Sequence, residues 1–138
     1  MYNEMNIRFI SKRTNIVVIR NMVGAMIIEY NPTITYLNEL KTVLSEIITN
    51  SIVHGYDNNE DQYIDIYIKI DSDKFSCDII DYGVGIDDVK KAKEPLYSTK
   101  KDDERSGLGF TIMELFCDVL NVDSKVNKGT KIHFEKKW

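Results

Sequence analysis

The order of the elements that the sequence predicts favours an α+β fold, a two-layer sandwich of helices on a mixed, mostly antiparallel sheet. Apolar residues recur at helical spacing through the first part of the chain, after a short opening strand. From residue 63 onward, apolar and polar residues alternate in strand fashion, and one further helix interrupts the strands. Helices and strands that cluster separately along a chain are typical of this architecture.

The first half of the sequence predicts one strand and two helices. Residues 5–10 alternate between apolar and polar side chains, which indicates a strand. A helix is expected over residues 15–30, and the segment Asn31-Pro32-Thr33 ends it and begins the next helix. That second helix is expected over residues 35–54, with Gly55 as a left-handed cap at its end.

The second half predicts a set of strands around one helix. Asp71-Ser72-Asp73 and Asn127-Lys128-Gly129 are turn sequences between alternating segments, so both predict hairpins. The expected elements are strands at 63–70 and 75–81, a short helix near 87–93, a helix at 110–120, and strands around 122 and at 131–135.

Length and composition restrict the class of protein. The chain has 138 residues, 18 Lys and Arg against 22 Asp and Glu, and a formal charge of −4. We expect a single domain over residues 1–138, too short for a multidomain enzyme. The acidic balance argues against nucleic acid as a partner, and the apolar segments are too short for a membrane span. Cys77 and Cys117 have no metal-binding or redox spacing, which fits a cytoplasmic protein.

Glu46 and Asn50 are the first candidates for chemistry. They lie four positions apart on the second predicted helix, so they share a face. A solvated helix face explains such a pair without any function. Val43 and Val53 flank the pair, however, and a carboxylate and an amide in a partly apolar wall can act as a general base and a metal ligand.

Two glycine-containing segments are the other candidates. Asp81-Tyr82-Gly83-Val84-Gly85 follows a predicted strand, where closely spaced glycines let a flat ligand approach the backbone. Ser106-Gly107-Leu108-Gly109 opens a predicted helix, where free amides can bind phosphate, and Arg105 adds a positive charge. Each segment alone is also explained as a turn or a loop-to-helix junction.

Taken in order along the chain, these three features resemble the Bergerat ATP-binding fold of the GHKL superfamily, shared by gyrase, heat-shock-90 chaperones, histidine kinases and mismatch-repair ATPases. Within that superfamily, the sequence is most similar to the anti-sigma-F factors of spore-forming bacteria, which are serine protein kinases. The segments that carry the resemblance are Leu44–Tyr56, Glu94–Lys100 and Glu104–Glu114.

The resemblance implies a role for each matching residue. Glu46 would be the general base that takes a proton from the attacking serine, and Asn50 would hold Mg²⁺ against the triphosphate of ATP. Asp81 would accept a hydrogen bond from the adenine amino group, supported by Thr130. Arg105 would stabilise charge on the transferred phosphoryl group. The remaining residues that would contact the base or form the lid and phosphate cradle are Gly83, Gly85, Thr99, Lys100, Gly107 and Gly109.

The resemblance also implies partners. The chain would act as a homodimer that binds and inhibits a sporulation sigma factor (sigma-F), and it would use ATP to phosphorylate and inactivate the anti-anti-sigma factor. The N-terminal strand would pair across the dimer axis, because an exposed strand edge invites pairing. Arg20 and Glu104 are the candidate partner contacts, although the sequence alone favours a solvated helix position for Arg20. Two alternatives are a nucleotide-gated sigma-binding module without kinase activity, and a stress-response anti-sigma kinase with a different partner.

Overall fold

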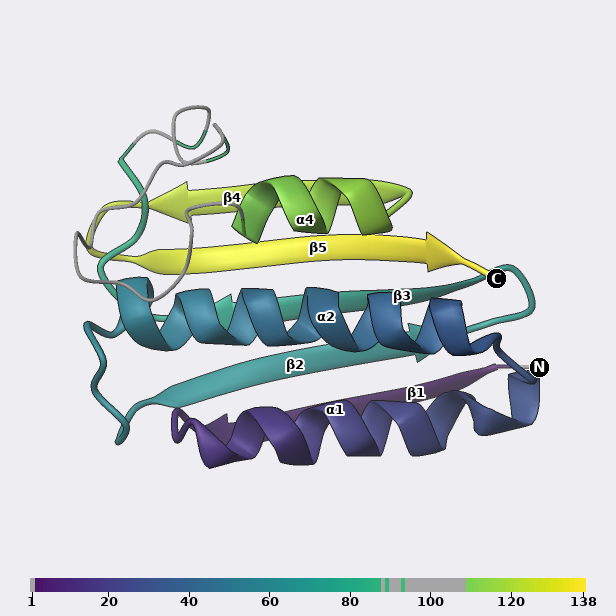
Figure 1. The fold of residues 1–138 in the computed structure, drawn as a ribbon. Helices are drawn as coiled ribbons and strands as arrows, with labels where there is room; N and C mark the ends of the chain where they lie inside the picture. The colour runs from purple at the N-terminus through teal and green to yellow at the C-terminus, as the bar shows by residue number, and fades with distance from the viewer. Residues whose placement is uncertain (1, 88, 90–92, 94–108) are drawn as a thin grey trace.

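The computed structural model describes residues 2–87, 89, 93 and 109–138. In this part of the chain one sheet carries all the helices on a single face (Figure 1), which confirms the predicted α+β class. The strands are β1 (Asn3–Ile10), β2 (Tyr63–Ile70), β3 (Lys74–Asp81), β4 (Val119–Lys125) and β5 (Gly129–Lys137). The helices are α1 (Thr14–Ile27), α2 (Ile34–Asn50) and α4 (Gly109–Phe116), with a 3₁₀ turn, η1 (Ile28–Tyr30), and a π turn, η2 (Ser51–Gly55).

The strand order is β1-β2-β3-β5-β4, and every pairing among these strands is antiparallel. The sequence predicts a mixed, mostly antiparallel sheet, and the connections explain why no parallel pairing occurs among the described strands. The chain between β1 and β2 contains two helices of opposite direction, so β2 returns antiparallel to β1. β3 and β4, which precede and follow α4 in the sequence, run in the same direction. They do not pair with each other, because β5 lies between them in the sheet.

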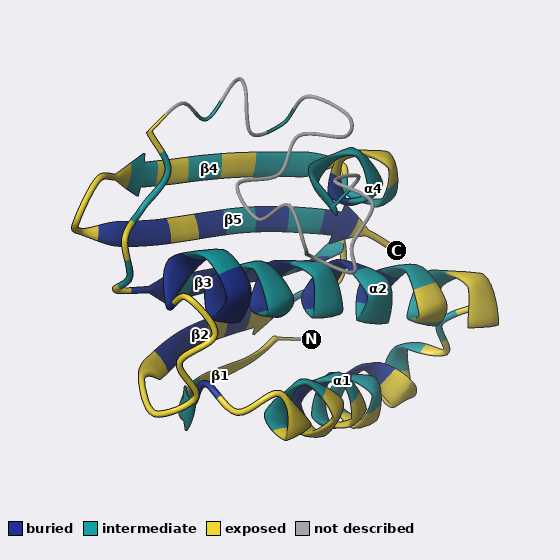
Figure 2. Cartoon of the chain, turned by 60° about the vertical axis from the view of Figure 1, so that its left-hand side comes forward, coloured by how far each residue is buried: buried dark blue, intermediate teal, exposed yellow. Residues whose placement is uncertain are grey.

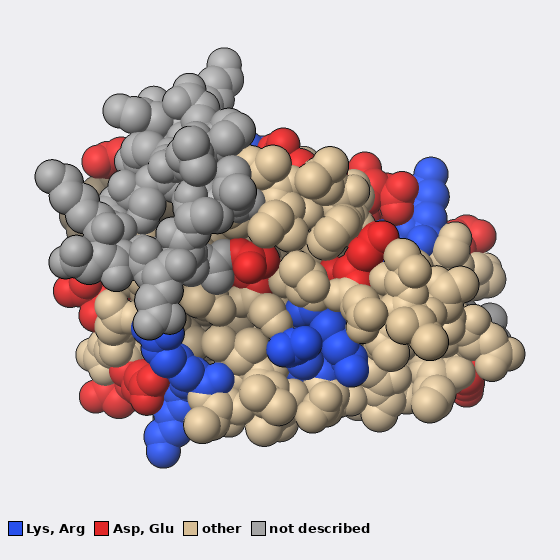
Figure 3. Space-filling model, viewed as in Figure 1, with Lys and Arg blue, Asp and Glu red and all other residues tan. Residues whose placement is uncertain are grey.

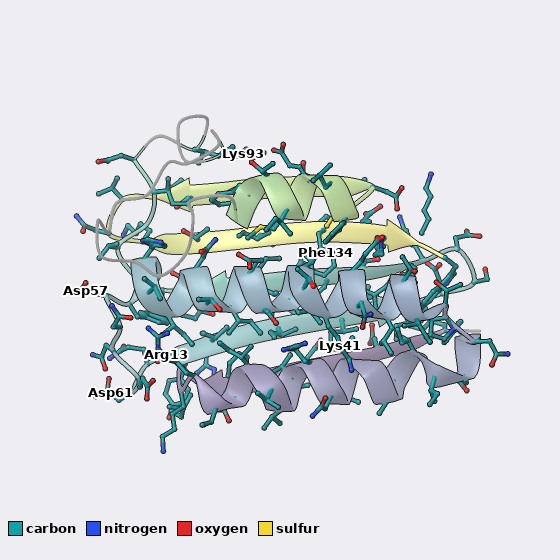
Figure 4. The ribbon with its side chains drawn as sticks, viewed as in Figure 1. Arg13, Lys41, Asp57, Asp61, Lys93 and Phe134 are labelled. Atoms are coloured by element: carbon teal, nitrogen blue, oxygen red, sulfur yellow. The ribbon has the colours of Figure 1, made fainter. Side chains whose placement is uncertain are left out.

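The core lies between the helices and the covered face of the sheet (Figure 2). The alternation predicted for residues 63–70 is confirmed, because all four isoleucines of β2 are fully buried. Phe134 on β5 points from the sheet toward the helices (Figure 4) and packs against Phe75, with ring centroids 5.8 Å apart. The buried stripe of α2 meets this surface with Leu40, Val43, Leu44, Ile47 and Ile48.

The junction between α1 and α2 follows the prediction. Asn31 adopts a left-handed backbone with φ 50°, which ends the first helix. Thr33 then caps α2, since its side chain accepts a hydrogen bond from the Tyr36 backbone N–H at 3.0 Å.

The end of the second helix differs from the prediction. Gly55 is not in the left-handed region; Asp57 and Asn58 adopt that conformation instead, with φ of 51° and 64°. The chain leaves α2 through η2 and stays helical as far as Gly55. A glycine after a helix usually supplies backbone freedom, whereas Gly55 supplies space for a neighbouring side chain, as described below.

The last helix is shorter than the predicted 110–120. α4 ends at Phe116, and residues 119 and 120 already pair with Glu135 and Phe134 in the sheet. Apolar residues 119 and 120 continue the helical periodicity, so the pattern alone does not reveal the switch to a strand. Of the short helix expected at 87–93, only residues 87, 89 and 93 lie in the described part.

Near the centre of the outer face of the helical layer, a cluster of Lys and Arg side chains lies among uncharged residues (Figure 3). Lys41 lies there between α1 and α2 (Figure 4), and its Cε would be 3.3 Å from a Cβ placed on Gly24. Across the described ranges, the structure has no helix of the length and apolar character that a membrane span requires.

Candidate functional site

The candidate site lies at the end of the sheet where η2, the C-terminal end of β3 and the hairpin between β4 and β5 come together (Figure 1). Asp81 is the last residue of β3 and pairs with Thr130 of β5. Gly55 ends η2 beside the Asp81 carboxylate. Three segments that are distant in sequence therefore meet around one acidic side chain.

Asp81 is a buried carboxylate, with only 3% of its surface exposed. Burial raises its pKa to about 6, even though hydrogen bonds from the Gly83 N–H, the Ser51 hydroxyl and the Thr130 N–H act in the opposite direction. The Gly83 bond is 3.0 Å long and reaches Oδ1. At neutral pH the side chain is therefore mainly ionised, at a position where its charge is costly unless hydrogen-bond donors surround it.

Two glycines make room around Asp81. A Cβ on Gly55 would lie 2.8 Å from Asp81 Oδ1, so any side chain at this position would displace the carboxylate. A Cβ on Gly83 would lie 1.9 Å from the Gly55 carbonyl oxygen. The end of η2 and the chain after β3 therefore approach each other with no space for a side chain.

The segment after Gly83 is held between η2 and the β4–β5 hairpin. The Val84 N–H donates to the Gly55 carbonyl at 2.9 Å, and the Val84 carbonyl accepts from the Asn127 N–H at 2.7 Å. Gly85 has a φ of +75° and faces the Lys125 carbonyl, which would lie 2.1 Å from a Cβ. The prediction that Gly83 and Gly85 permit close backbone approach is consistent with this packing, although the partner approached in the structure is the protein itself.

Tyr56 reinforces the same corner. Its hydroxyl donates to the Tyr63 carbonyl and accepts from the Tyr82 N–H at 2.8 Å. Burial raises the pKa of this hydroxyl, so it remains a protonated donor at physiological pH. The backbone immediately after Asp81 is thus tied to the segment that follows η2.

Glu46 and Asn50 lie on α2, one turn apart and both half-buried. Val43 and Val53 beside them are buried, as expected for a partly apolar wall. Asn50 is the last residue of α2, and the next residue, Ser51, hydrogen-bonds to Asp81. The backbone therefore connects the acid–amide pair directly to the buried carboxylate.

The remaining predicted residues are distributed differently. Gly109 is the first residue of α4. Arg20 lies on α1, half-buried, and its buried Nε has no hydrogen-bond partner in the part of the chain that the structure describes. The predictions that fall outside the described residues are Thr99, Lys100, Glu104, Arg105 and Gly107. Within the described residues, the His, Cys, Asp and Glu side chains form no group of three or more suited to a metal ion.

The sequence analysis assigns no role in the site to three residues that contribute to it. Ser51 contributes a donor to Asp81, Gly55 gives the carboxylate space, and Ser124 on β4 contacts Thr130. A serine in the apolar helical stretch beside Asn50 is the one visible signal for Ser51. Ser124 carries no signal, because its significance depends on pairings between strands.

Comparisons with known proteins identify the family of this chain. Residues 9–136 match the family model described as a histidine kinase-like ATPase domain. The chain is 47% identical to the anti-sigma F factor of Clostridium beijerinckii, over 99% of this chain and 95% of that protein. It is 42% identical to the anti-sigma F factor of Geobacillus stearothermophilus, over 100% and 94% of the two chains.

A solved structure supports the fold independently. The histidine kinase domain of the blue-light activated histidine kinase from Erythrobacter litoralis matches with a TM-score of 0.54 and 16% identity, over 73% of this chain and 44% of that one. At this identity the match concerns the fold alone. Together with the family model and the full-length relatives, it shows that the chain belongs to the histidine kinase-like ATPase domain family, in the branch of the anti-sigma F factors.

Proposed function

We propose that this protein is an anti-sigma factor and an ATP-dependent serine protein kinase. It binds and inhibits a sporulation sigma factor of the sigma-F type, and it phosphorylates a serine of the anti-anti-sigma factor. The family supports the nucleotide and the kinase-like fold, and the similarity to anti-sigma F factors supports a sigma factor as partner. The observation that best supports this proposal is the environment of Asp81.

The hydrogen-bond inventory of Asp81 favours an amino group as its ligand. A carboxylate has about four acceptor positions on its two oxygens. The Gly83 N–H, the Ser51 hydroxyl and the Thr130 N–H account for three of them. The remaining position fits one N–H of an exocyclic amino group, which adenine carries and guanine lacks at the equivalent edge.

Glu46 and Asn50 suit the reacting end of the nucleotide. Mg²⁺ usually binds proteins through one or two oxygen ligands and completes its shell with phosphate and water oxygens. The Asn50 amide oxygen can supply such a ligand, and bound Mg²⁺ would neutralise charge on the triphosphate. Glu46, one turn earlier, would take the proton of the serine hydroxyl as its oxygen bonds to the γ-phosphorus and the bond to ADP breaks.

Phosphate transfer to the anti-anti-sigma factor tests the kinase proposal. We expect wild type to transfer radiolabel from ATP and Glu46→Gln to lose at least about a hundredfold in rate, because general-base catalysis contributes roughly 10²–10⁴-fold. Glu29→Gln, an exposed glutamate on η1, is the matched control and should keep the wild-type rate. Equal transfer by wild type and Glu46→Gln would contradict the role of Glu46.

The same proteins separate the alternatives. A sigma-binding module without kinase activity would retain the sigma factor in the presence of ATP but transfer no phosphate. A stress-response anti-sigma kinase would transfer phosphate but fail to retain the sporulation sigma factor. Retention of that sigma factor together with phosphate transfer supports the proposal.

We also propose that the protein is a homodimer paired through β1. Among the described strands, β1 pairs only with β2, and its other edge is open for a second copy. Met5 on this strand is 38% exposed although it faces the helical side of the sheet. Sedimentation of the purified protein should give twice the mass of one chain, and a monomer at all concentrations would contradict this pairing.

A further inference from the structure

Ser124 on β4 joins three segments of the candidate site through one hydroxyl group. The Ile86 N–H donates to Ser124 Oγ at 2.8 Å, which fixes the chain just beyond Gly85. The same hydroxyl donates to the Gly129 carbonyl at 3.1 Å. It also lies 2.7 Å from the hydroxyl oxygen of Thr130, close enough for a hydrogen bond in either direction.

The hydrogen-bonding capacity of a serine hydroxyl decides that direction. The group has one proton to donate and two lone pairs to accept with. Its proton goes to the Gly129 carbonyl, which can only accept, and one lone pair accepts from the Ile86 N–H. All three contacts are hydrogen bonds only if the second lone pair accepts the proton of Thr130. The Thr130 hydroxyl therefore donates to Ser124.

The direction of this bond changes what Thr130 offers to a ligand. With its proton directed to Ser124, Thr130 Oγ1 presents only lone pairs on its other side. Thr130 also donates its backbone N–H to the Asp81 carboxylate, so the two side chains are adjacent. Asp81 and Thr130 Oγ1 then offer a ligand two hydrogen-bond acceptors and no hydroxyl donor.

We propose that Ser124 is a positioning residue that holds the Thr130 hydroxyl as an acceptor and so sets the preference for a purine with an exocyclic amino group over one with a carbonyl. This inference rests on the proposed function, because it assumes that the base of the nucleotide binds at Asp81 and Thr130. The amino group of adenine has two N–H donors, which match the two acceptors, whereas the O6 atom of guanine is an acceptor and would face them.

The test compares ATP and GTP affinity by calorimetry in the full chain. In Ser124→Ala the Thr130 hydroxyl loses its acceptor and can turn its proton toward the base. We expect the ratio of ATP to GTP affinity to fall about tenfold, roughly the effect of one hydrogen bond. Ser124→Thr keeps the hydroxyl on a strand that favours β-branched residues and should restore the ratio. Ser124→Cys, with a weaker hydrogen-bonding group of similar size, should give an intermediate ratio and covers the case in which the alanine variant does not fold.

Repeating the test in a Thr130 variant distinguishes positioning of the Thr130 hydroxyl by Ser124 from a general effect of Ser124 on the structure. Thr130→Val removes the hydroxyl through which Ser124 is proposed to act. In that background, Ser124→Ala should leave the ATP-to-GTP ratio unchanged. The same loss in both backgrounds would show that Ser124 acts through the Ile86 segment, and an unchanged ratio in Ser124→Ala alone would also overturn the inference. If wild type binds neither nucleotide, the proposed function itself fails.

Discussion

Asp81 is the residue on which the candidate site depends, and its burial gives it a measurable signature. Its neutral neighbours supply hydrogen bonds, and burial nevertheless raises its pKa to about 6 from an ordinary value of 3.8. Ionisation of Asp81 in the ligand-free protein therefore costs free energy. A ligand that donates one more hydrogen bond offsets part of that cost, which couples binding to the ionised form.

Asp81→Asn tests this interaction directly. We expect ATP affinity to fall by about 1–3 kcal/mol, because the amide cannot accept from all the surrounding donors and carries no charge. Asp78→Asn is the matched control: it lies on the same strand, on the opposite sheet face, where its carboxylate contacts His133. Calorimetry with unchanged affinity in Asp81→Asn would remove this residue from base recognition.

Two glycines give a matched test of space at the site. In Gly55→Ala the new Cβ would lie 2.8 Å from Asp81 Oδ1, so the carboxylate must move and ATP binding should be lost. Gly24→Ala is a substitution within helix α1. Its new Cβ would lie 3.3 Å from the nearest atom, Cε of the flexible Lys41 side chain. There we expect binding to persist and stability to change by no more than about 1 kcal/mol, the difference in helix propensity. Nucleotide titration and urea unfolding of both variants provide the comparison; intact binding in Gly55→Ala would contradict the packing around Asp81.

At the scale of elements, an aromatic cluster joins the end of β5 to the helical layer. The Trp138 ring stacks on Tyr30 with centroids 4.7 Å apart and lies 5.2 Å from the ring of Tyr36. Its indole N–H donates to the Asp71 carbonyl at 2.8 Å. Next to it, the buried Lys136 ammonium donates to Glu39 on α2. These contacts hold the turn before β3, the start of α2 and the end of β5 together.

Trp138→Ala should therefore destabilise the fold, although the ring is partly exposed. We expect the free energy of unfolding to fall by about 1–3 kcal/mol, from the lost stacking and buried area. Leu115→Ala serves as the control, because this side chain is 73% exposed on α4 and its removal should change stability by less than about 0.5 kcal/mol. Equal midpoints for the two variants in urea would show that the cluster contributes nothing.

The elements that the sequence predicts well are those governed by local periodicity. The isoleucines of β2 and the stripe of α2 need no knowledge of their partners, because a period of two or 3.6 marks the buried face. The errors arise where a distant segment decides. Residues 119 and 120 join the sheet because β5 pairs with them, and Gly55 leaves room for the distant Asp81 carboxylate instead of acting as a left-handed cap.

At the scale of the whole molecule, the open face of the sheet carries a charged network that links pH to stability. His133 on β5 contacts Asp78 on β3 at 2.8 Å and Glu135 at 2.9 Å, one carboxylate at each ring nitrogen. Partial burial acts to lower the pKa of His133, but the hydrogen bonds and charges of the two acids outweigh it and the pKa is raised. Lys74 donates to the same Glu135 at 2.7 Å.

The sign of the pH effect follows from this shift. A histidine whose pKa is raised on folding stabilises the protein fully below its unfolded pKa, near 6.5, and loses that contribution as pH rises through the folded value. We expect the urea midpoint of wild type to fall as the pH rises above 6.5, and His133→Gln to show a smaller decrease. Asp81 follows the same sign at lower pH, between 3.8 and about 6, so it does not interfere. A parallel decrease in both proteins would exclude His133 as the cause.

The candidate site shows the limit of sequence reasoning at this scale. Order along the chain places Glu46, Asn50 and Asp81 in one motif, but the donors to Asp81 come from η2, the segment after β3, and β5. Ser124 lies on yet another strand and meets Thr130 only through the β4–β5 hairpin. Such contacts depend on sheet order, which no local pattern specifies.

The interior position of β5 also determines when the sheet can be completed during synthesis. β5 is the last of the described strands in sequence, yet it lies between β3 and β4 and brings Thr130 to Asp81. During synthesis, β1, β2 and β3 leave the ribosome with one edge of β3 still unpaired. Until β5 emerges, that edge is open to pairing with other chains, and the nascent polypeptide lacks the contact between Thr130 and Asp81. If the base binds at Asp81 and Thr130, as proposed above, nucleotide can stabilise only chains whose translation has passed Thr130.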